Sequence, residues 1–275
     1  MSQINQNIEI NKKIAFTSLL ESYLDLLLDI EILNQRVSPI IEEIFYSKLG
    51  SLQFEVKSLE LDVFRNKRRI DLINAEISKN HTPDFNIIEK KIETEFLVWK
   101  TNVAKLGRQL KMSISDRTPH LDDDELTILN SKMRKIISKI HPSISDTNID
   151  DLQLLYENAL KYYKFNNIAG LEIICDEIYD IQAINEINYL ENNVDFNLEY
   201  DKIENLLQSK TIEKEKLMTS FPLGFIDLIN DIDWIQKRKS ELRKIKAELL
   251  SQNNLLLQVL NFIKYDLNYG QFSPN

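Results

Sequence analysis

A repeat with alternating spacings of three and four residues, running from Leu49 to Ile77, constrains the fold of this chain more than any other feature. Sustained over about four heptads, this spacing is typical of a coiled-coil helix that buries one stripe against a partner. We therefore predict one helix of about 40 residues from Ser38-Pro39 to Asn80, with Ser38 as its N-cap and Pro39 at its first position. The repeat consists of Leu49, Leu52, Val56, Leu59, Val63, Asn66, Ile70, Ile73 and Ile77.

Asn66 is the one polar residue in this repeat, and it allows two interpretations. A buried amide needs a polar group across the seam, and Asn66 would then fix the register or select the partner helix. Alternatively, the helices separate at this point and leave Asn66 half exposed. The sequence favours neither interpretation over the other.

The scarcity of helix-breaking residues extends the helical prediction to the whole chain. Only 5 Gly and 6 Pro occur among 275 residues, so the elements between turns must be long. The same spacing of apolar residues returns over 88–110, where Trp99 is expected in the seam, and over 235–263. The predicted fold class is all-α, with long antiparallel coiled-coil hairpin arms flanking a small helical module.

Prolines and polar stretches divide the chain into three predicted domains. Residues 1–113 form an N-terminal helix and coiled-coil hairpin, and residues 120–182 form the central module. Residues 195–268 form a C-terminal coiled-coil arm, in which 197–219 packs against 231–267. The sequence leaves open whether these arms pack on the module or extend from it.

Composition argues against several functional classes. The net charge of −9 disfavours nonspecific nucleic-acid binding, which needs a basic surface. Cys175 is the only cysteine, so no intramolecular disulfide can form, and with three scattered histidines no metal site is expected. The chain has no phosphate-binding or hydrolase motif, so neither enzymatic activity nor a cofactor is expected. It also shows no signal peptide and no apolar run long enough for a membrane span, which favours a cytoplasmic protein.

The central module contains a local concentration of positive charge, opposite in sign to the net charge of the whole chain. After a polar linker whose acids, Asp122 to Asp124, are expected to cap the next helix, residues 129–140 place their apolar side chains on one face. The cations on the remaining surface form a plausible docking face for an acidic partner. A His-Pro turn follows, and a second amphipathic helix begins near Leu152 and should pack antiparallel to the first. The cations of this face are Lys132, Arg134, Lys135 and Lys139.

The stretch 126–178 resembles the J domain of co-chaperones for DnaK-type chaperones. The resemblance rests on the basic series Lys132 to Ile136, the turn His141-Pro142, and Tyr156 to Ala159 in the next helix. With its heptad arms, the chain is similar to bacterial coiled-coil proteins that carry such a domain. The resemblance implies a protein partner, with a DnaK-type chaperone as the candidate. The residues implied to contact this partner are Lys132, Arg134, Lys135, Lys139, His141, Pro142 and Ser143.

The third residue of the turn departs from the family. J domains that stimulate their chaperone carry His-Pro-Asp, whereas this chain carries Ser143 and lacks the carboxylate for a charge-assisted hydrogen bond. We therefore expect a non-enzymatic interaction scaffold built on a degenerate J-like module, with self-association through exposed heptad faces. The alternatives are a co-chaperone that regulates a DnaK-type ATPase and, third, a nucleic-acid-associated module.

Overall fold

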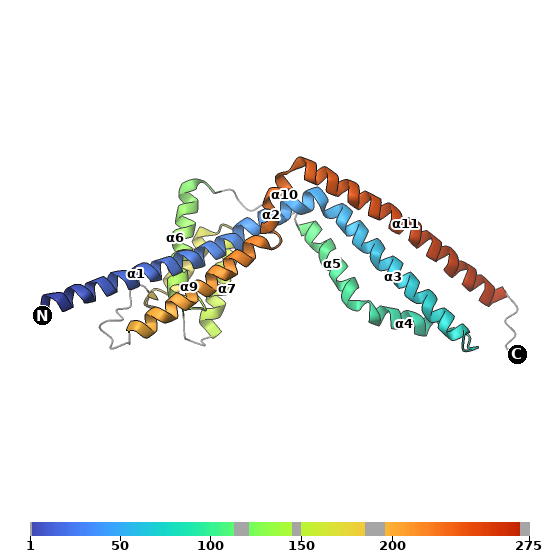
Figure 1. Ribbon diagram of the computed structural model, residues 1–275, viewed down its shortest axis with the longest axis horizontal. Helices are drawn as coiled ribbons and strands as arrows, with labels where there is room; N and C mark the ends of the chain where they lie inside the picture. The colour runs from blue at the N-terminus through green and yellow to red at the C-terminus, as the bar shows by residue number, and fades with distance from the viewer. Residues whose placement is uncertain (1, 113–120, 145–149, 185–195, 270–275) are drawn as a thin grey trace. The chain divides into compact units, whose positions relative to one another are not determined.

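The computed structural model describes residues 2–112, 121–144, 150–184 and 196–269, and all its regular elements in these ranges are helices (Figure 1). The prediction of an all-α fold is confirmed. None of the helices described there combines the length and the apolar character needed to cross a membrane. The predicted loop after Ile144, the predicted break at 192–195 and most of the linker and tail lie outside the described residues.

The helices follow one another in chain order, and those from α1 to α3 have no intervening residue. They are α1 (Ser2–Ile32), the π-helical turn η1 (Leu33–Val37), α2 (Ser38–Phe45), the π-helical turn η2 (Tyr46–Gly50), α3 (Ser51–Ile77), α4 (Phe85–Glu95), α5 (Leu97–Met112), α6 (Asp123–Ile140), α7 (Asp150–Lys164), α8 (Ile168–Glu177), α9 (Phe196–Thr219), the 3-10 turn η4 (Leu223–Phe225), α10 (Ile226–Asn230) and α11 (Ile232–Tyr269).

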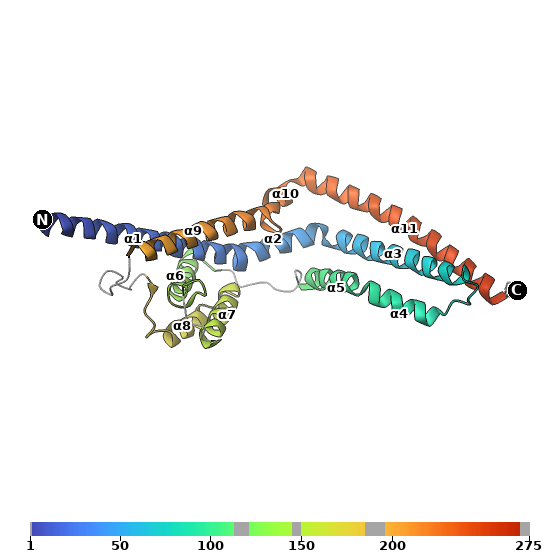
Figure 2. The same cartoon turned by 60° about the horizontal axis from the view of Figure 1, so that its bottom comes forward.

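Two compact units make up the chain, and each combines segments that are far apart in the sequence. Unit 1 contains residues 1–41 and 117–226, and unit 2 contains residues 42–116 and 227–275. These units group the residues of the chain differently from the three predicted domains. α9 packs along α1 within unit 1, and α11 packs along α3 within unit 2 (Figure 2).

In unit 2, α3 lies between α11 on one side and α4 with α5 on the other. α11 runs parallel to α3, since Lys246 pairs with Glu55 at 2.6 Å and Asn253 lies further along beside Asn66. α4 runs antiparallel to α3, because Arg69 pairs with Glu89 whereas Arg65, earlier in α3, pairs with the later Glu93. The seam between α3 and α11 is therefore parallel, whereas α4, which belongs to the predicted N-terminal hairpin, is antiparallel to α3.

The predicted helix boundary at Ser38-Pro39 is wrong. Helical structure continues from α1 through η1 and α2 into α3, and the Ser38 hydroxyl is buried and caps nothing. The backbone N–H of Ser38 instead donates to the carbonyl of Leu33, closing the wider π-helical turn just before the proline. Such a turn lets a helix accommodate a residue that lacks an N–H donor.

The helix predicted from the apolar spacing over 88–110 is divided in two, α4 and α5. The Asp84 carboxylate caps α4 by accepting from the N–H groups of Asn86 and Ile87, at 2.8 and 3.2 Å. The helix then ends at Phe96, whose φ of −101° and ψ of 8° leave the α-helical region. Trp99 begins the packing of α5 on α3, with its ring 5.1 Å from that of Phe64.

Two glycines allow α5 to approach the helix that carries α3. A Cβ atom on Gly107 of α5 would lie 2.9 Å from the Phe54 ring, and one on Gly50 would lie 2.8 Å from Leu110. Both distances are shorter than carbon atoms tolerate without a shift of the neighbour. Gly50 is thus a packing residue.

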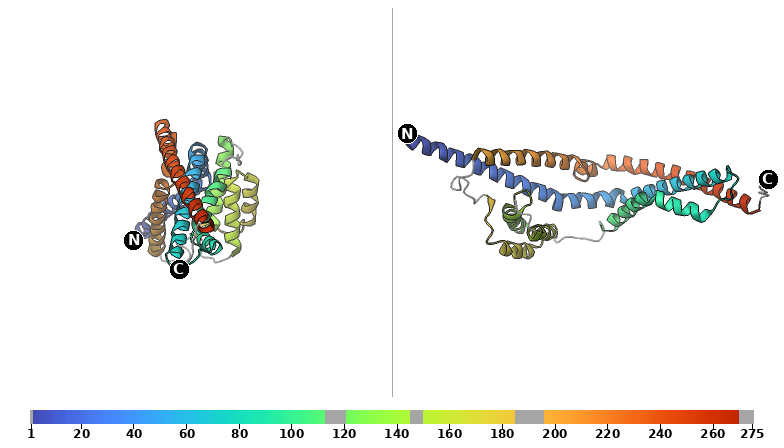
Figure 3. Two further views of the ribbon diagram at one scale, coloured as in Figure 1. Left: turned by 90° about the vertical axis from the view of Figure 1, so that its right-hand side faces the viewer. Right: turned by 90° about the horizontal axis from the view of Figure 1, so that it is seen from below.

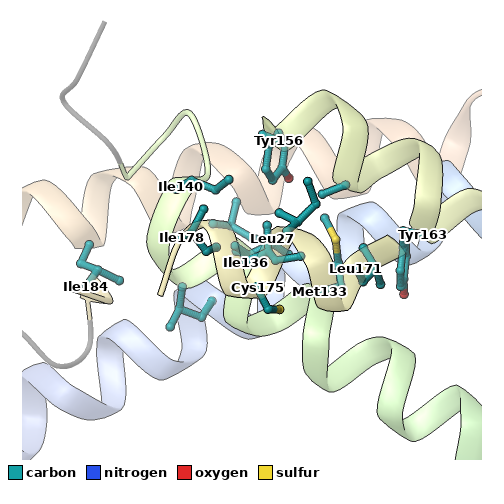
Figure 4. Close-up of a cluster of buried hydrophobic side chains, with 14 of the residues drawn as sticks. Leu27, Met133, Ile136, Ile140, Tyr156, Tyr163, Leu171, Cys175, Ile178 and Ile184 are labelled. Atoms are coloured by element: carbon teal, nitrogen blue, oxygen red, sulfur yellow. The ribbon is translucent and has the colours of Figure 1, made fainter. Parts of the chain in front are cut away.

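Unit 1 is organised around α6, which contacts α1, α7 and α8. α1 and α9 run side by side in the same direction, because Phe16 meets Phe196 and the later Asp29 pairs with Lys214 at 2.7 Å (Figure 3). Leu27 of α1 joins Met133 of α6 in the apolar core between these helices (Figure 4). The core therefore holds the central module and the α1/α9 pair together.

Candidate interaction surface on α6 and α8

α6 is fixed at its first turn by a reciprocal cap. The Asp122 carboxylate accepts from the Glu125 N–H at 2.8 Å, and the Glu125 carboxylate accepts from the Asp122 N–H at 3.1 Å. This confirms that the acids before the module cap its helix. The predicted apolar face is fully buried, and it consists of Leu129, Met133, Ile136, Ile137 and Ile140.

The His141 ring belongs to the interior of unit 1. Its Nδ1 accepts a hydrogen bond from the Ser143 N–H at 3.0 Å, and its ring forms a T-shaped contact with the Tyr156 ring, with the centroids 5.1 Å apart. Burial lowers the pKa of His141 to about 4, and the nearby positive charge of Lys210 acts in the same direction. His141 is consequently neutral near pH 7, with its proton on Nε2, and it holds the turn in place.

A buried carboxylate lies next to this turn. The Tyr156 hydroxyl donates to Glu31 of α1 at 3.0 Å, and burial raises the pKa of the Glu31 carboxyl. Pro142 is exposed and Ser143 is half-buried. The His-Pro-Ser turn is thus packed through His141 and Tyr156 against α1, which sequence reasoning did not foresee.

Three of the four cations predicted to dock a partner are engaged within unit 1. Arg134 pairs with Glu21 and Asp25 of α1, the second at 2.9 Å. Lys132 pairs with Glu172 of α8 at 3.2 Å. Lys139 donates to the backbone carbonyls of residues 178 and 179, at 3.2 and 2.9 Å, at the C-terminal end of α8. Most of the predicted basic face is therefore neutralised or bonded by the chain itself.

Lys135 differs from the other three cations. Its side chain is exposed, and within the ranges that the structure describes it forms no ion pair. Ile128 lies two turns earlier on the same face of α6 and is 47% exposed. Tyr179 follows α8, lies beside Lys139 and is 71% exposed. We call the surface formed by Ile128, Lys132, Lys135, Glu172 and Tyr179 the α6–α8 edge.

Cys175 lies beneath this edge. Its thiol is buried, 3.9 Å from the carbonyl of Lys132, and burial raises its pKa. A buried thiol with a raised pKa is a poor nucleophile. Among the described residues, no group of three His, Cys, Asp or Glu side chains could hold a metal ion.

No family model, curated protein or solved structure matches this chain. The likeness to J domains therefore rests on the residues of the module alone.

The contacts between Arg134 and α1 had only a weak signal in the sequence. Glu21 and Asp25 are one turn apart on a helix, but nothing local relates them to a cation more than 100 residues away.

Proposed function

We propose that the protein is a non-enzymatic interaction scaffold and that the α6–α8 edge is its partner-binding surface. The observation that carries this proposal is the position of Lys135, an exposed cation without an ion pair among the described residues. It lies on the same face of α6 as the exposed Ile128 and one turn before Lys139, beside which the exposed Tyr179 ring lies. A mixed surface of this kind is typical of protein interfaces, in which aromatic anchors are combined with polar groups. The cytoplasmic location predicted from the sequence belongs to this proposal.

The edge favours a protein partner with an acidic and an apolar group close together. A carboxylate could pair with Lys135, and the Tyr179 ring offers a large contact area that loses little conformational freedom on binding. Lys132 already pairs with Glu172, so it contributes little net charge to a partner. We therefore expect the partner to contact fewer residues of the predicted basic face than the seven that the resemblance implies.

Affinity purification of the full chain from its host tests this proposal. The variants Lys135→Glu and Tyr179→Ala should each lose the partner that the wild type captures. Lys161→Glu is the matched control, because Lys161 is an exposed cation on α7 of the same unit. Equal capture of one protein by all four chains would disprove the assignment to the α6–α8 edge.

A co-chaperone is the second candidate. It is favoured by the packing of α6 against α7 on either side of the His141-Pro142 turn, the arrangement that the resemblance predicts. Addition of the protein to the DnaK-type chaperone of its host should then raise the rate of ATP turnover, and more so for Ser143→Asp. An unchanged rate with both chains would remove this candidate.

Nucleic-acid association is supported less than either of these. The engagement of Lys132, Arg134 and Lys139 within unit 1 leaves Lys135 as the free cation of the predicted basic face in the described region. Counterion release needs several such charges. Electrophoretic mobility shift at low salt with DNA and RNA would revive this candidate only if Lys135→Glu abolished binding.

A further inference from the structure

The helix α5 exposes a face that contains cations and no acid. Its 16 residues include four cations, and none of them is Asp or Glu. Lys105, Arg108 and Lys111 are exposed and make no ion pair with a described residue, whereas Lys100 pairs with Glu93 at 2.8 Å. Because residues three apart are neighbours on a helix, the three exposed cations lie along one side of α5.

Two exposed apolar residues begin the same face. Leu97 and Val98 are 58% and 74% exposed, and Leu97 lies about three turns before Arg108 on the same side of the helix. The opposite side of α5 packs on α3 through Trp99 and Gly107. We call the surface formed by Leu97, Val98, Lys105, Arg108 and Lys111 the α5 outer face.

The carboxylates of Glu42 and Glu93 border the α5 outer face without neutralising it. Glu42 accepts from the Gln109 amide at 3.3 Å, and Glu93 is engaged by Lys100. The surrounding unit is also not acidic, since unit 2 contains 20 Lys and Arg against 18 Asp and Glu, although the whole chain has a net charge of −9. The charge of unit 2 therefore does not oppose the approach of an anionic partner.

We propose that the α5 outer face binds an acidic segment of a partner protein. The segment would carry apolar residues at one end, which cover Leu97 and Val98, and carboxylates along the rest, which pair with the three cations. From Val98 to Lys111 the helix rises about 20 Å, so the segment has to span this length. Charge-assisted hydrogen bonds then select the partner, and the apolar end adds buried area.

Other anionic partners fit this face less well. A nucleic-acid backbone pairs with cations, but its phosphates and sugars offer no apolar cover for Leu97 and Val98. A helix that lies on a membrane buries a broad apolar face in the lipid, whereas the apolar side of α5 is already packed on α3. An acidic protein segment satisfies the cations and the apolar residues together.

This inference goes beyond the scaffold function proposed for the α6–α8 edge. The α6–α8 edge belongs to unit 1 and the α5 outer face to unit 2, and the two surfaces share no residue. Binding at one surface can therefore fail while binding at the other persists, and the variants that test them differ.

Fluorescence anisotropy with a labelled synthetic peptide tests the charge of this surface in the full chain. The peptide carries two leucines at one end and glutamates at every third or fourth position over the following four turns. The wild type should bind it at low salt. Neutralising the three cations together, Lys105→Gln with Arg108→Gln and Lys111→Gln, should weaken binding about ten- to a hundredfold, because three ion pairs are lost.

The matched control removes the same charge elsewhere in unit 2. Lys237, Arg243 and Lys244 are exposed cations on α11, and none of them makes an ion pair with a described residue. Their joint replacement by Gln should leave binding of the peptide nearly unchanged. Equal losses in the two triple variants, or no binding of the peptide by the wild type, would overturn the proposal.

A last pair of variants tests the apolar end and the class of partner. Leu97→Ser with Val98→Ser should weaken binding of the peptide about tenfold, since apolar area is no longer buried. Circular dichroism should show that every variant keeps the helix content of the wild type. Tighter binding of a DNA duplex or of anionic phospholipid vesicles than of the peptide would contradict the proposal.

Discussion

The side-chain amide of Asn66 on α3 donates a 2.8 Å hydrogen bond to the side-chain oxygen of Asn253 on α11. Asn66 is buried, and its own oxygen accepts from Arg69. The structure thus decides between the two interpretations of this residue. The polar partner across the seam exists, and it belongs to the same chain, so the pair fixes how α11 is aligned along α3.

Replacement of one member of this pair should cost more than replacement of both. Asn253→Leu removes the acceptor of the buried Asn66 amide and should lower the free energy of unfolding by about 1 to 3 kcal/mol. The double variant Asn66→Leu with Asn253→Leu should be more stable than either single variant, because no amide is left unsatisfied. Urea denaturation of the four chains checks this, and additive losses would contradict it.

Acid should destabilise unit 1 through His141. In the unfolded chain the imidazole takes up a proton near its ordinary pKa of 6.5, whereas in the folded chain it does so only at about 4. The contribution of neutral His141 to the free energy of unfolding is therefore fully present above pH 6.5. It is lost as the pH drops toward 4, and the loss for this group alone is about 3 kcal/mol.

The variant His141→Asn isolates the contribution of this histidine. An asparagine can still accept from the Ser143 N–H but does not titrate, so its denaturation midpoint should depend less on pH between 6.5 and 4. The measurement is urea denaturation at a series of pH values. If the denaturation midpoints of the two chains changed equally with pH, His141 would not be buried in the neutral form.

A methyl group at Gly107 should destabilise unit 2. Alanine favours a helix by about 1 kcal/mol over glycine, but here its Cβ would lie 2.9 Å from the Phe54 ring. We expect Gly107→Ala to lower the thermal midpoint, with a net loss of about 1 to 2 kcal/mol from overpacking. In a Phe54→Ala background the same substitution should become stabilising, and a loss in both backgrounds would exclude this contact as the cause.

Removal of the Arg134 guanidinium should have a small, salt-dependent effect. Its ion pairs with Glu21 and Asp25 are partly exposed, so Arg134→Ala should cost about 1 kcal/mol or less. The difference in the free energy of unfolding between this variant and the wild type should shrink in 1 M NaCl. At this salt concentration the Debye length is about 3 Å, so exposed ion pairs are strongly screened. Lys161→Ala serves as the control. If salt did not change the loss of stability in Arg134→Ala, the loss would come from packing of the side-chain stem and not from the ion pairs.

Local features of the fold were predictable because their physical cause is local. The caps Asp84 and Asp122, the buried face of α6 and the heptad repeat of α3 each depend on residues within a few turns. The all-α class follows from the same signals. The role of His141 in the turn was likewise accessible from its place at the end of a helix.

Helix pairing was not predictable, because an apolar stripe does not specify its partner. α9 and α11 each have a face that could pack on the other, yet α9 packs on α1 and α11 on α3. Within α11, the run Leu255 to Leu257 offers apolar side chains in three directions, so the spacing could not show that Val259 faces outward. Similarly, the charge of Arg134 gave no indication that acids of α1 would neutralise it.

The parallel seam also sets an order of events during protein synthesis. Asn66 emerges from the ribosome 187 residues before Asn253, so the seam face of α3 must wait for nearly the whole chain to be translated. Over that interval only α4 and α5, on its other side, are available to cover α3 within unit 2. Such long-range pairing slows folding and leaves apolar surface open to association. Premature termination before α11 would consequently release a chain with an uncovered seam, a natural target for quality-control proteases.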